Sequence, residues 1–344
     1  MLRLPPFEYR RPASVREAAA IIADQGPSAR VVAGGTDLWP NMKRRHQQAA
    51  TVVSLMSIPE LCSIAAESDS TEVRIGATAT LSQVQQKEEI QTHFPALARA
   101  IRSISSPPLR NMGTLGGNLC LDTRCTYYNQ TEGWRRSIDY CMKEAGTVCW
   151  VAPSSPRCWA HTASDSAPML AALGARVRLV SATADRTLPV SELFLDDGID
   201  YLAKRPEELL TEIFLPAESS AENCRSSFWK LRRRGSIDFA VLSVAAVVWF
   251  DDKDRVARAS VYLGAVGSYP LPVADVDEIL IGHPMNEEKI DEVAKSARRI
   301  ATPMDNTDFK AQWRGAMTRA YTQAALREIA GLDPGLMPPN HSMP

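Results

Sequence analysis

Four cysteines with the residue type and clustering of metal ligands occupy one stretch of the chain. Cys125, Cys141, Cys149 and Cys158 follow one another at intervals of 16, 8 and 9 residues. Four thiolates can hold a 2Fe–2S cluster, a 4Fe–4S cluster or a structural zinc ion. The spacing is wider than the CxxC pairs of zinc ribbons, and it lacks the tight C-x2-C-x2-C run of bacterial ferredoxins. The spacing therefore leaves three interpretations open: iron–sulfur, zinc, or unrelated buried cysteines that behave as small apolar residues.

The other cysteines and a nearby histidine are weaker ligand candidates. Cys120 directly follows a glycine turn, so we interpret it as a packing residue, and Cys62 and Cys224 are isolated in the sequence. His161 lies close to Cys158, but four thiolates already complete a site. Aromatic side chains crowd residues 127–159 and would give a cluster the dry shell that sets its potential. An ordinary local core would have the same composition.

Two glycine turns could bind an anion. The first runs from Gly34 to Leu38 and the second from Gly113 to Asn118. A turn without Cβ atoms lets backbone N–H groups approach an anion closely, and Thr36 and Thr114 add hydroxyl donors. The first turn is not the G-x-G-x-x-G fingerprint, and alone it could be a plain tight turn. Together, the two turns predict a cradle for a diphosphate group.

The bulk properties exclude several functional classes. The chain has 344 residues, of which 45% are hydrophobic and 23% charged, as in globular proteins with a substantial core. A net charge of −1 gives no broad basic surface for nucleic acid. No apolar run approaches the roughly 18 residues that a membrane span needs, and the N-terminus does not resemble a signal peptide. We therefore expect a cytoplasmic protein, in which clustered cysteines are more often metal ligands or catalytic groups than disulfides.

The elements predicted around these motifs form at least two units. A capping box at Ser14 begins a helix that ends at Gly26, and a strand at 30–33 leads into the first glycine turn. A polar, proline-bounded stretch at 216–223 marks a boundary, beyond which strands and two late helices indicate an α+β unit. The further predicted strands cover residues 51–56, 72–77, 176–181, 209–215, 239–250 and 258–266, and the further predicted helices cover 81–89, 95–103, 169–175, 287–301 and 309–329.

These motifs resemble the flavin subunits of the xanthine dehydrogenase family of molybdenum enzymes. The resemblance rests on VVAGGTDL at 31–38, RNMGTLGGNL at 110–119, Asp165, Lys230, Arg232, Arg233 and VYLGAV at 261–266. It covers nearly the whole chain and implies an α+β fold, with a two-part PCMH-type (vanillyl-alcohol-oxidase-like) FAD-binding domain and an α+β C-terminal domain. The implied bounds are 1–57 and 58–218 for the two FAD-binding subdomains, 224–332 for the C-terminal domain and 333–344 for a tail.

The resemblance also implies which residues bind FAD. The first glycine turn would wrap the diphosphate, the second would complete that cradle, and Asp165 would accept hydrogen bonds from the ribityl hydroxyls. Leu210 would pack on the isoalloxazine ring, and Lys230 would lie near its polar edge, where a lysine favours the negative charge of reduced flavin. A core leucine and an exposed surface lysine are the plainer interpretations of these two residues. The implied FAD-binding residues are Val32, Ala33, Gly34, Gly35, Thr36, Asp37, Leu38, Ile104, Ser105, Thr114, Gly117, Asn118, Asp165, Leu210 and Lys230.

An interval of 46 residues separates Asn118 from Asp165, and most members of the family lack it. With its four cysteines, this insert at about 119–164 resembles that of the 4-hydroxybenzoyl-CoA reductases within the family, where it carries a 4Fe–4S cluster. The resemblance implies Cys125, Cys141, Cys149 and Cys158 as the cluster ligands, and no catalytic residue on this chain.

The same resemblance implies a role and partners. Ferredoxin would supply electrons to the 4Fe–4S cluster and FAD, which would pass them to the 2Fe–2S clusters of a gamma subunit and to a molybdopterin-containing alpha subunit. The enzyme would reduce 4-hydroxybenzoyl-CoA to benzoyl-CoA as a dimer of heterotrimers. Two alternatives remain: the FAD subunit of an oxidising enzyme of the xanthine or CO dehydrogenase type, and a zinc-stabilised, flavin-binding interaction subunit.

Overall fold

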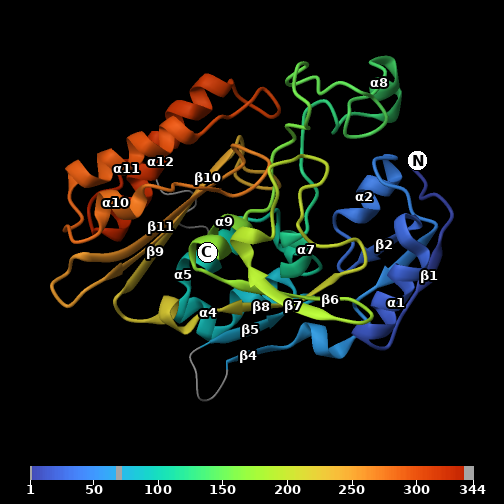
Figure 1. Cartoon of the computed structure of the whole chain (residues 1–344), viewed down its shortest axis with the longest axis horizontal. Helices are drawn as coiled ribbons and strands as arrows, with labels where there is room; N and C mark the ends of the chain where they lie inside the picture. Colours follow the sequence, from blue (N-terminus) through green and yellow to red (C-terminus); the bar gives the residue numbers. More distant parts are fainter. Residues whose placement is uncertain (1, 67–71, 337–344) are drawn as a thin grey trace.

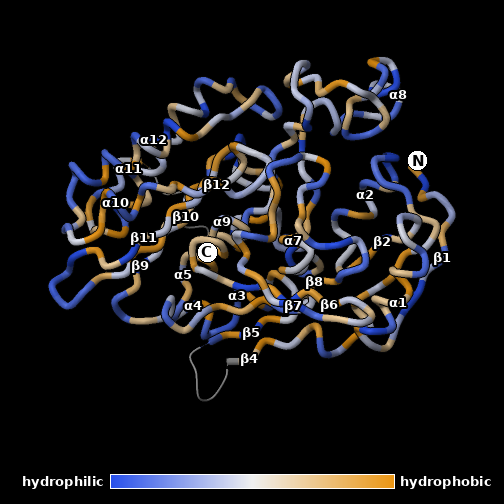
Figure 2. The backbone as a smooth tube through the Cα atoms, viewed as in Figure 1, coloured by the Kyte–Doolittle hydropathy of each residue, from blue (hydrophilic) through white to orange (hydrophobic). Residues whose placement is uncertain are grey.

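Three sheets form the framework of the part of the chain that the computed structural model describes, residues 2–66 and 72–336 (Figure 1). The predicted tail at 333–344 lies outside the described residues from position 337 onward. Hydrophobic residues concentrate along the strands and the helices that cover them, and hydrophilic residues occupy the outer turns (Figure 2). No helix in the described ranges is long and apolar enough to cross a bilayer.

The first sheet is small and parallel, in the order β1-β3-β2. It consists of β1 (Glu8–Arg10), β3 (Thr51–Ser54) and β2 (Ala29–Val32). Helix α1 (Val15–Gln25) packs against it and begins at the predicted cap, where the Ser14 side chain accepts a hydrogen bond from the Glu17 amide. The second bond of a capping box differs, because the Glu17 carboxylate accepts from the Ala13 amide and not from the Ser14 amide. The first glycine turn leads from β2 into α2 (Leu38–Lys43).

The second sheet has the order β4-β5-β8-β6-β7, and all its strand pairs are antiparallel. Its strands are β4 (Ile64–Ala66), β5 (Val73–Gly76), β8 (Leu209–Leu215), β6 (Arg176–Val180) and β7 (Asp185–Pro189). Its helices are α3 (Leu81–Gln86), α4 (Glu88–His93), α5 (Pro95–Arg102), α6 (Pro107–Arg110), α7 (Leu115–Leu119) and α9 (Ser166–Ala172). The predicted helix at 81–89 is wrong as a single element, because Lys87 adopts an extended conformation between α3 and α4.

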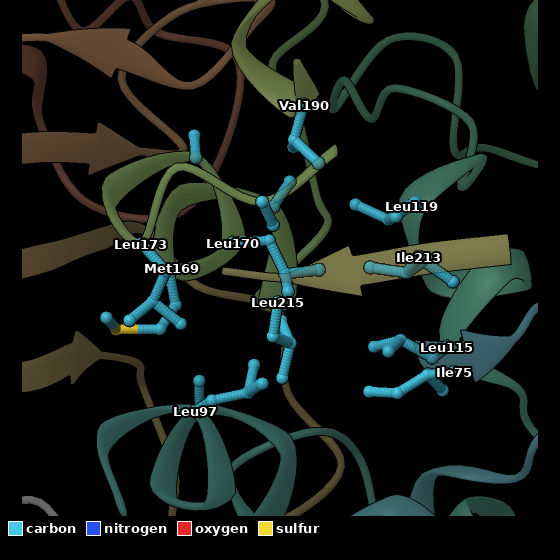
Figure 3. Close-up of a cluster of buried hydrophobic side chains, with 14 of the residues drawn as sticks. Ile75, Leu97, Leu115, Leu119, Met169, Leu170, Leu173, Val190, Ile213 and Leu215 are labelled. Carbon is cyan, nitrogen blue, oxygen red and sulfur yellow. The ribbon is translucent and has the colours of Figure 1, made fainter. Parts of the chain in front are cut away.

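The core of this unit anchors the second glycine turn. Leu115 and Leu119 of α7 are fully buried in the same apolar cluster as Ile75 of β5, Ile213 of β8 and Leu170 of α9 (Figure 3). Side chains in a close-packed interior have little room to move. Helix α7 therefore holds the turn that precedes it in a fixed position.

The third sheet, β12-β11-β10-β9, is antiparallel and lies in the C-terminal unit. It comprises β12 (Leu271–Pro272), β11 (Val256–Gly264), β10 (Leu242–Phe250) and β9 (Cys224–Leu231), with helices α10 (Val276–Leu280), α11 (Glu287–Ile300) and α12 (Ala311–Ile329). Strand β9 was not predicted from the sequence, and it carries Lys230. Short 3-10 helices cover Gly26–Ser28, Pro59–Cys62, Val190–Glu192 and Ala217–Ser220.

The insert at 119–164 rises from the end of α7 as loops that contain one short helix, α8 (Glu132–Ser137) (Figure 1). It contacts both flanking units. The Tyr128 hydroxyl donates to the carbonyl of His46 at 2.9 Å, and the Thr126 amide donates to the carbonyl of Asn306 at 2.8 Å. The insert is therefore fixed between the N-terminal unit and the C-terminal unit.

Candidate functional site

The two glycine turns meet in space, as the sequence predicts for a shared cradle. A Cβ atom on Gly34 would come within 1.7 Å of the backbone oxygen of Met112, so the two loops touch through their main chains. Beside this contact, a Cβ on Gly113 would lie 3.3 Å from Oγ1 of Thr36. Thr114 caps α7, and its side chain accepts from the Gly117 amide at 3.1 Å.

A cavity of about 530 Å³ lies against these turns, within the size range of cofactor sites. Its wall includes both turns, the stretch Ile104–Ser105, part of β8, and Phe239 of the C-terminal unit. Thirteen of the fifteen residues predicted to bind FAD line it; the exceptions are Asp165 and Lys230. The volume and the backbone lining from both turns suit a bulky nucleotide cofactor, and the glycines let the two turns pack closely because a Cβ on Gly34 or Gly116 would meet neighbouring protein atoms.

Asp165 and Lys230 form a buried ion pair beside the cavity. The Lys230 Nζ donates to Oδ2 of Asp165 at 2.7 Å and to the carbonyl of Ser103 at 3.0 Å. Burial raises the pKa of Asp165, and the Lys230 charge opposes that rise. Lys230 is buried rather than an exposed surface lysine, and it does not line the cavity wall. Oδ1 of Asp165 is also buried and has no hydrogen-bond partner among the described residues, which leaves one carboxylate oxygen for a ligand donor.

Lys230 also holds the turn that presents Ser105 to the cavity. Ser105 has a φ of 50°, a backbone conformation that is costly for a residue other than glycine. Around it, the Arg232 guanidinium donates to the Ser103 carbonyl at 3.3 Å and the Arg110 guanidinium donates to the Ile104 carbonyl at 2.8 Å. Donors from separate segments thus stabilise a strained turn in the wall of the site.

Replacing Lys230 by methionine is expected to lower the free energy of unfolding by about 3–5 kcal/mol, because it leaves the Asp165 carboxylate buried without its cation. Urea unfolding of the full chain measures this change. Lys253→Met, which alters an exposed lysine, should change stability by no more than about 0.5 kcal/mol. An equal, small effect of both substitutions would contradict a structural role for the buried pair.

The two ends of the insert are joined at the cavity wall. Oδ1 of Asn118 accepts from the hydroxyls of Ser164 and Ser166 at 2.9 and 2.6 Å, and from the Ser166 amide at 3.2 Å. Further out, the backbones of Arg124 and His161 exchange two hydrogen bonds of 2.8 Å. These contacts bring the start and the end of the insert together. Cys125 directly follows Arg124 and Cys158 lies shortly before His161, so both cysteines are next to this backbone pair.

The four predicted ligand cysteines are all buried, and the structure brings them together. Cys125, Cys141 and Cys158 pack in one small apolar cluster with Tyr128 and Ala160. Cys149 lies close enough for its charge to raise the pKa of each of the other three thiols. Burial is the main cause in every case and raises the pKa of Cys125 to about 11 and that of Cys158 to about 12. Cys62, Cys120 and Cys224 lie outside this group.

Backbone amides point at three of the sulfurs. The Ala160 amide donates to Sγ of Cys158 at 3.4 Å. The amides of Tyr127 and Tyr128 lower the pKa of Cys125 by hydrogen bonding, and the Lys143 amide does the same for Cys141. Hydrogen bonds to thiolate sulfur stabilise the charged form that binds metal and tune the potential of iron–sulfur clusters.

A cluster and a single ion place different demands on the four thiols. In the described part of the chain, no three His, Cys, Asp or Glu side chains are placed to share one metal ion. A structural zinc needs four ligands converging on one atom at about 2.3 Å. In a 4Fe–4S cluster each cysteine binds a different iron, so the four sulfurs lie farther apart. The four thiols are buried, and backbone amides point at three of them, which is the ligand chemistry that an iron–sulfur cluster requires.

Sequence reasoning missed several residues of the cavity wall. Thr78 lies just after β5, is almost fully buried, and its Oγ1 has no partner among the described residues. Asp122 and Tyr201 also line the cavity, and both contact Lys143 of the insert. The strand preceding Thr78 was predicted and could have pointed to it. Nothing local marks Asp122 or Tyr201, which lie far apart in the chain.

Comparison with known proteins agrees with this geometry. Residues 5–218 match the model of the FAD binding domain in molybdopterin dehydrogenase, and residues 226–329 match that of the CO dehydrogenase flavoprotein C-terminal domain. The nicotinate dehydrogenase FAD-subunit of Eubacterium barkeri is 26% identical over 83% of this chain and 83% of its own length. The carbon monoxide dehydrogenase medium chain of Hydrogenophaga pseudoflava is 26% identical over 95% of this chain and 99% of its own.

A solved carbon monoxide dehydrogenase from Hydrogenophaga pseudoflava superposes with a TM-score of 0.79 at 25% identity, covering 96% of this chain and 99% of that one. Quinoline 2-oxidoreductase from Pseudomonas putida, at 22% identity and a TM-score of 0.75, shares the fold. The first model alone spans more than half of the chain. With its FAD-binding domain and its C-terminal flavoprotein domain, the chain belongs to the FAD-binding subunits of the molybdopterin dehydrogenase family.

Proposed function

We propose that this chain is the electron-transfer subunit of a molybdenum-dependent reductase of the 4-hydroxybenzoyl-CoA reductase type, carrying FAD and a 4Fe–4S cluster. Its partners would be a molybdopterin alpha subunit, a 2Fe–2S gamma subunit and ferredoxin as the donor, in a dimer of heterotrimers. The overall reaction takes two electrons and two protons and releases the phenolic hydroxyl of the substrate as water. That chemistry belongs to the molybdenum subunit; FAD and the cluster supply one-electron and two-electron transfer.

The observation that carries the proposal is the convergence of four buried cysteines in an insert that begins and ends at the flavin cavity. Asp122 lines the cavity, and Cys125 lies three residues later. Since consecutive Cα atoms are 3.8 Å apart, the Cα of Cys125 can be no more than about 11 Å from that of Asp122. A cluster held by these cysteines would therefore lie next to the flavin.

The chain's own residues hold the two sites in fixed positions. The glycine turns and Thr36 would bind the FAD diphosphate, and the free oxygen of Asp165 and the hydroxyl of Thr78 are available as hydrogen-bond acceptors or donors. Arg135 attaches the insert to the N-terminal unit. Its guanidinium contacts Glu144 of the insert at 2.6 Å and donates to the carbonyl of Arg44 at 3.3 Å. A dry, rigid setting keeps water from the cofactors and limits reorganisation when charge moves.

The second candidate is the FAD subunit of an oxidising enzyme of the xanthine or CO dehydrogenase type. The names of the similar proteins favour it, because they are dehydrogenases of nicotinate, caffeine and carbon monoxide. It gives no role to the four buried cysteines of the insert. The third candidate, a zinc-stabilised interaction subunit, would give the four cysteines a structural ion and no part in electron transfer.

Metal analysis of the anaerobically purified full chain tests the proposal. We expect roughly four irons and four acid-labile sulfides per chain beside one FAD, and an EPR signal after reduction with dithionite. Zinc at about one per chain without iron would favour the interaction subunit. FAD without iron, sulfide or zinc would favour the oxidising type. Either result would overturn the proposal.

A further inference from the structure

We propose that Lys143 sets the reduction potential of the cluster: its ammonium group, held by Asp122 between the flavin cavity and the four cysteines, favours the reduced state. This inference deepens the proposed function and rests on it, since it requires that the cysteines hold an iron–sulfur cluster.

Lys143 is a buried lysine whose charged group is fully bonded. Its Nζ donates to Oδ1 of Asp122 at 2.8 Å, to Oγ1 of Thr123 at 2.8 Å and to the carbonyl of Gly198 at 2.5 Å. The Lys143 and Asp122 side chains are only 5% and 10% exposed. An ammonium group has three donors, and here all three are used, so the charge cannot move to another position without losing a partner.

The ammonium lies between the two candidate cofactor sites. On one side, Asp122 and Tyr201 line the flavin cavity, and the Tyr201 ring centroid is 5.6 Å from Nζ. On the other side, the Tyr128 ring centroid is 5.1 Å from Nζ, and Tyr128 packs among the ligand cysteines. Lys143 also comes two residues after Cys141, and its backbone amide hydrogen-bonds to that sulfur, so the same residue contacts the cysteine group directly.

A buried ion pair at this place has a cost that stability does not explain. Removing both charges from water is expensive, and well-packed apolar residues often stabilise a fold as much or more. The carboxylate belongs to the cavity wall, and the ammonium lies over the ring of Tyr128, which packs among the cysteines. Such a fixed charge is what a protein uses to set a redox potential.

The sign of the effect follows from charge. Reduction adds one electron and no proton to the cluster, which makes it more negative by one unit. A nearby cation stabilises the added charge, and the low dielectric of a buried site strengthens that interaction. Loss of the ammonium should therefore make reduction less favourable, and loss of the Asp122 carboxylate should make it more favourable.

EPR-monitored redox titration of the full chain, purified anaerobically, tests this inference. Lys143→Met should lower the equilibrium constant of one-electron reduction by on the order of tenfold, a shift of about −59 mV. Asp122→Asn should move the potential in the opposite direction. Arg136→Met removes an exposed cation from the same insert, and solvent screening should leave its potential close to that of the unaltered chain.

Each outcome decides the matter. Full iron content with an unchanged potential in Lys143→Met, or a shift of the same sign in both buried variants, overturns the inference. If Lys143→Met loses iron, Asp122→Asn decides: a raised potential supports the inference and an unchanged one overturns it. Absence of iron in the unaltered chain is a different result, because it rejects the proposed function itself.

Discussion

Cys141→Ser is expected to release the iron and acid-labile sulfide of the insert while leaving FAD bound. Cys141 is buried, its thiol packs with those of Cys125 and Cys158, and the proposed cluster needs it as one of four ligands. Serine is nearly the same size, but its hydroxyl is a much poorer ligand for iron, which thiolates hold in these clusters. The flavin cavity should be preserved, because Cys141 does not line it.

The backbone before Cys141 supports the importance of its position. Asp139 and Tyr140 have φ values of 56° and 60°, two successive left-handed residues. A Cβ on Gly146 would come within 2.7 Å of the Tyr140 carbonyl oxygen, so the turn that follows is also closely packed. Strain of this kind persists only where surrounding structure enforces it, and it gathers at functional sites.

Cys62→Ser is the matched control, since Cys62 is exposed and distant in sequence from the insert. Iron, sulfide and FAD are measured per chain in both variants, together with the rate at which a strong one-electron donor reduces the flavin. The control should match the unaltered chain. Retention of iron, sulfide and the flavin reduction rate in Cys141→Ser would eliminate Cys141 as a ligand and, with it, the four-cysteine site.

Much of the fold could be predicted because its signals are local. The caps of α1, Ser14 and Gly26, lie directly beside the helix that they begin and end. The apolar run that predicts β8 lies within the strand itself. Strand β9 could not be predicted in this way. Its Ser227 is fully buried, and its hydroxyl donates to Glu328, which is 101 residues away. A polar residue in a strand is read as exposed until its partner is known.

Some residues of the candidate site could likewise be predicted from local signals in the sequence, and others could not. The glycine turns and the cysteines can be identified from residue type and spacing, and the structure brings each set together. Lys143 gives no such signal, because its value as a charged group depends on Asp122 and Gly198, which are 21 and 55 positions away. Lys230 was predicted near the polar edge of the flavin from the resemblance, and no local pattern indicates its bonds to Asp165 and the Ser103 carbonyl. Long-range packing decides both cases.

In the diphosphate cradle formed by the two glycine turns, Gly34→Ala is expected to weaken FAD binding on the order of 10- to 100-fold. The new Cβ would lie 1.7 Å from the carbonyl oxygen and 2.4 Å from the carbonyl carbon of Met112. Both are backbone atoms, so no side chain can rotate away, and the two glycine turns must separate. Overpacking costs of about 1–3 kcal/mol and a factor of ten per 1.4 kcal/mol give this range.

FAD content and the dissociation constant from flavin fluorescence quantify the loss, and circular dichroism shows whether the chain remains folded. Gly133→Ala is the matched control, because a Cβ on Gly133 meets nothing within 4 Å and this glycine lies in a helix. The control should bind FAD as tightly as the unaltered chain. If folded Gly34→Ala also did so, the contact between the two turns could not be what shapes the diphosphate site, since a cradle formed by both loops cannot tolerate their separation.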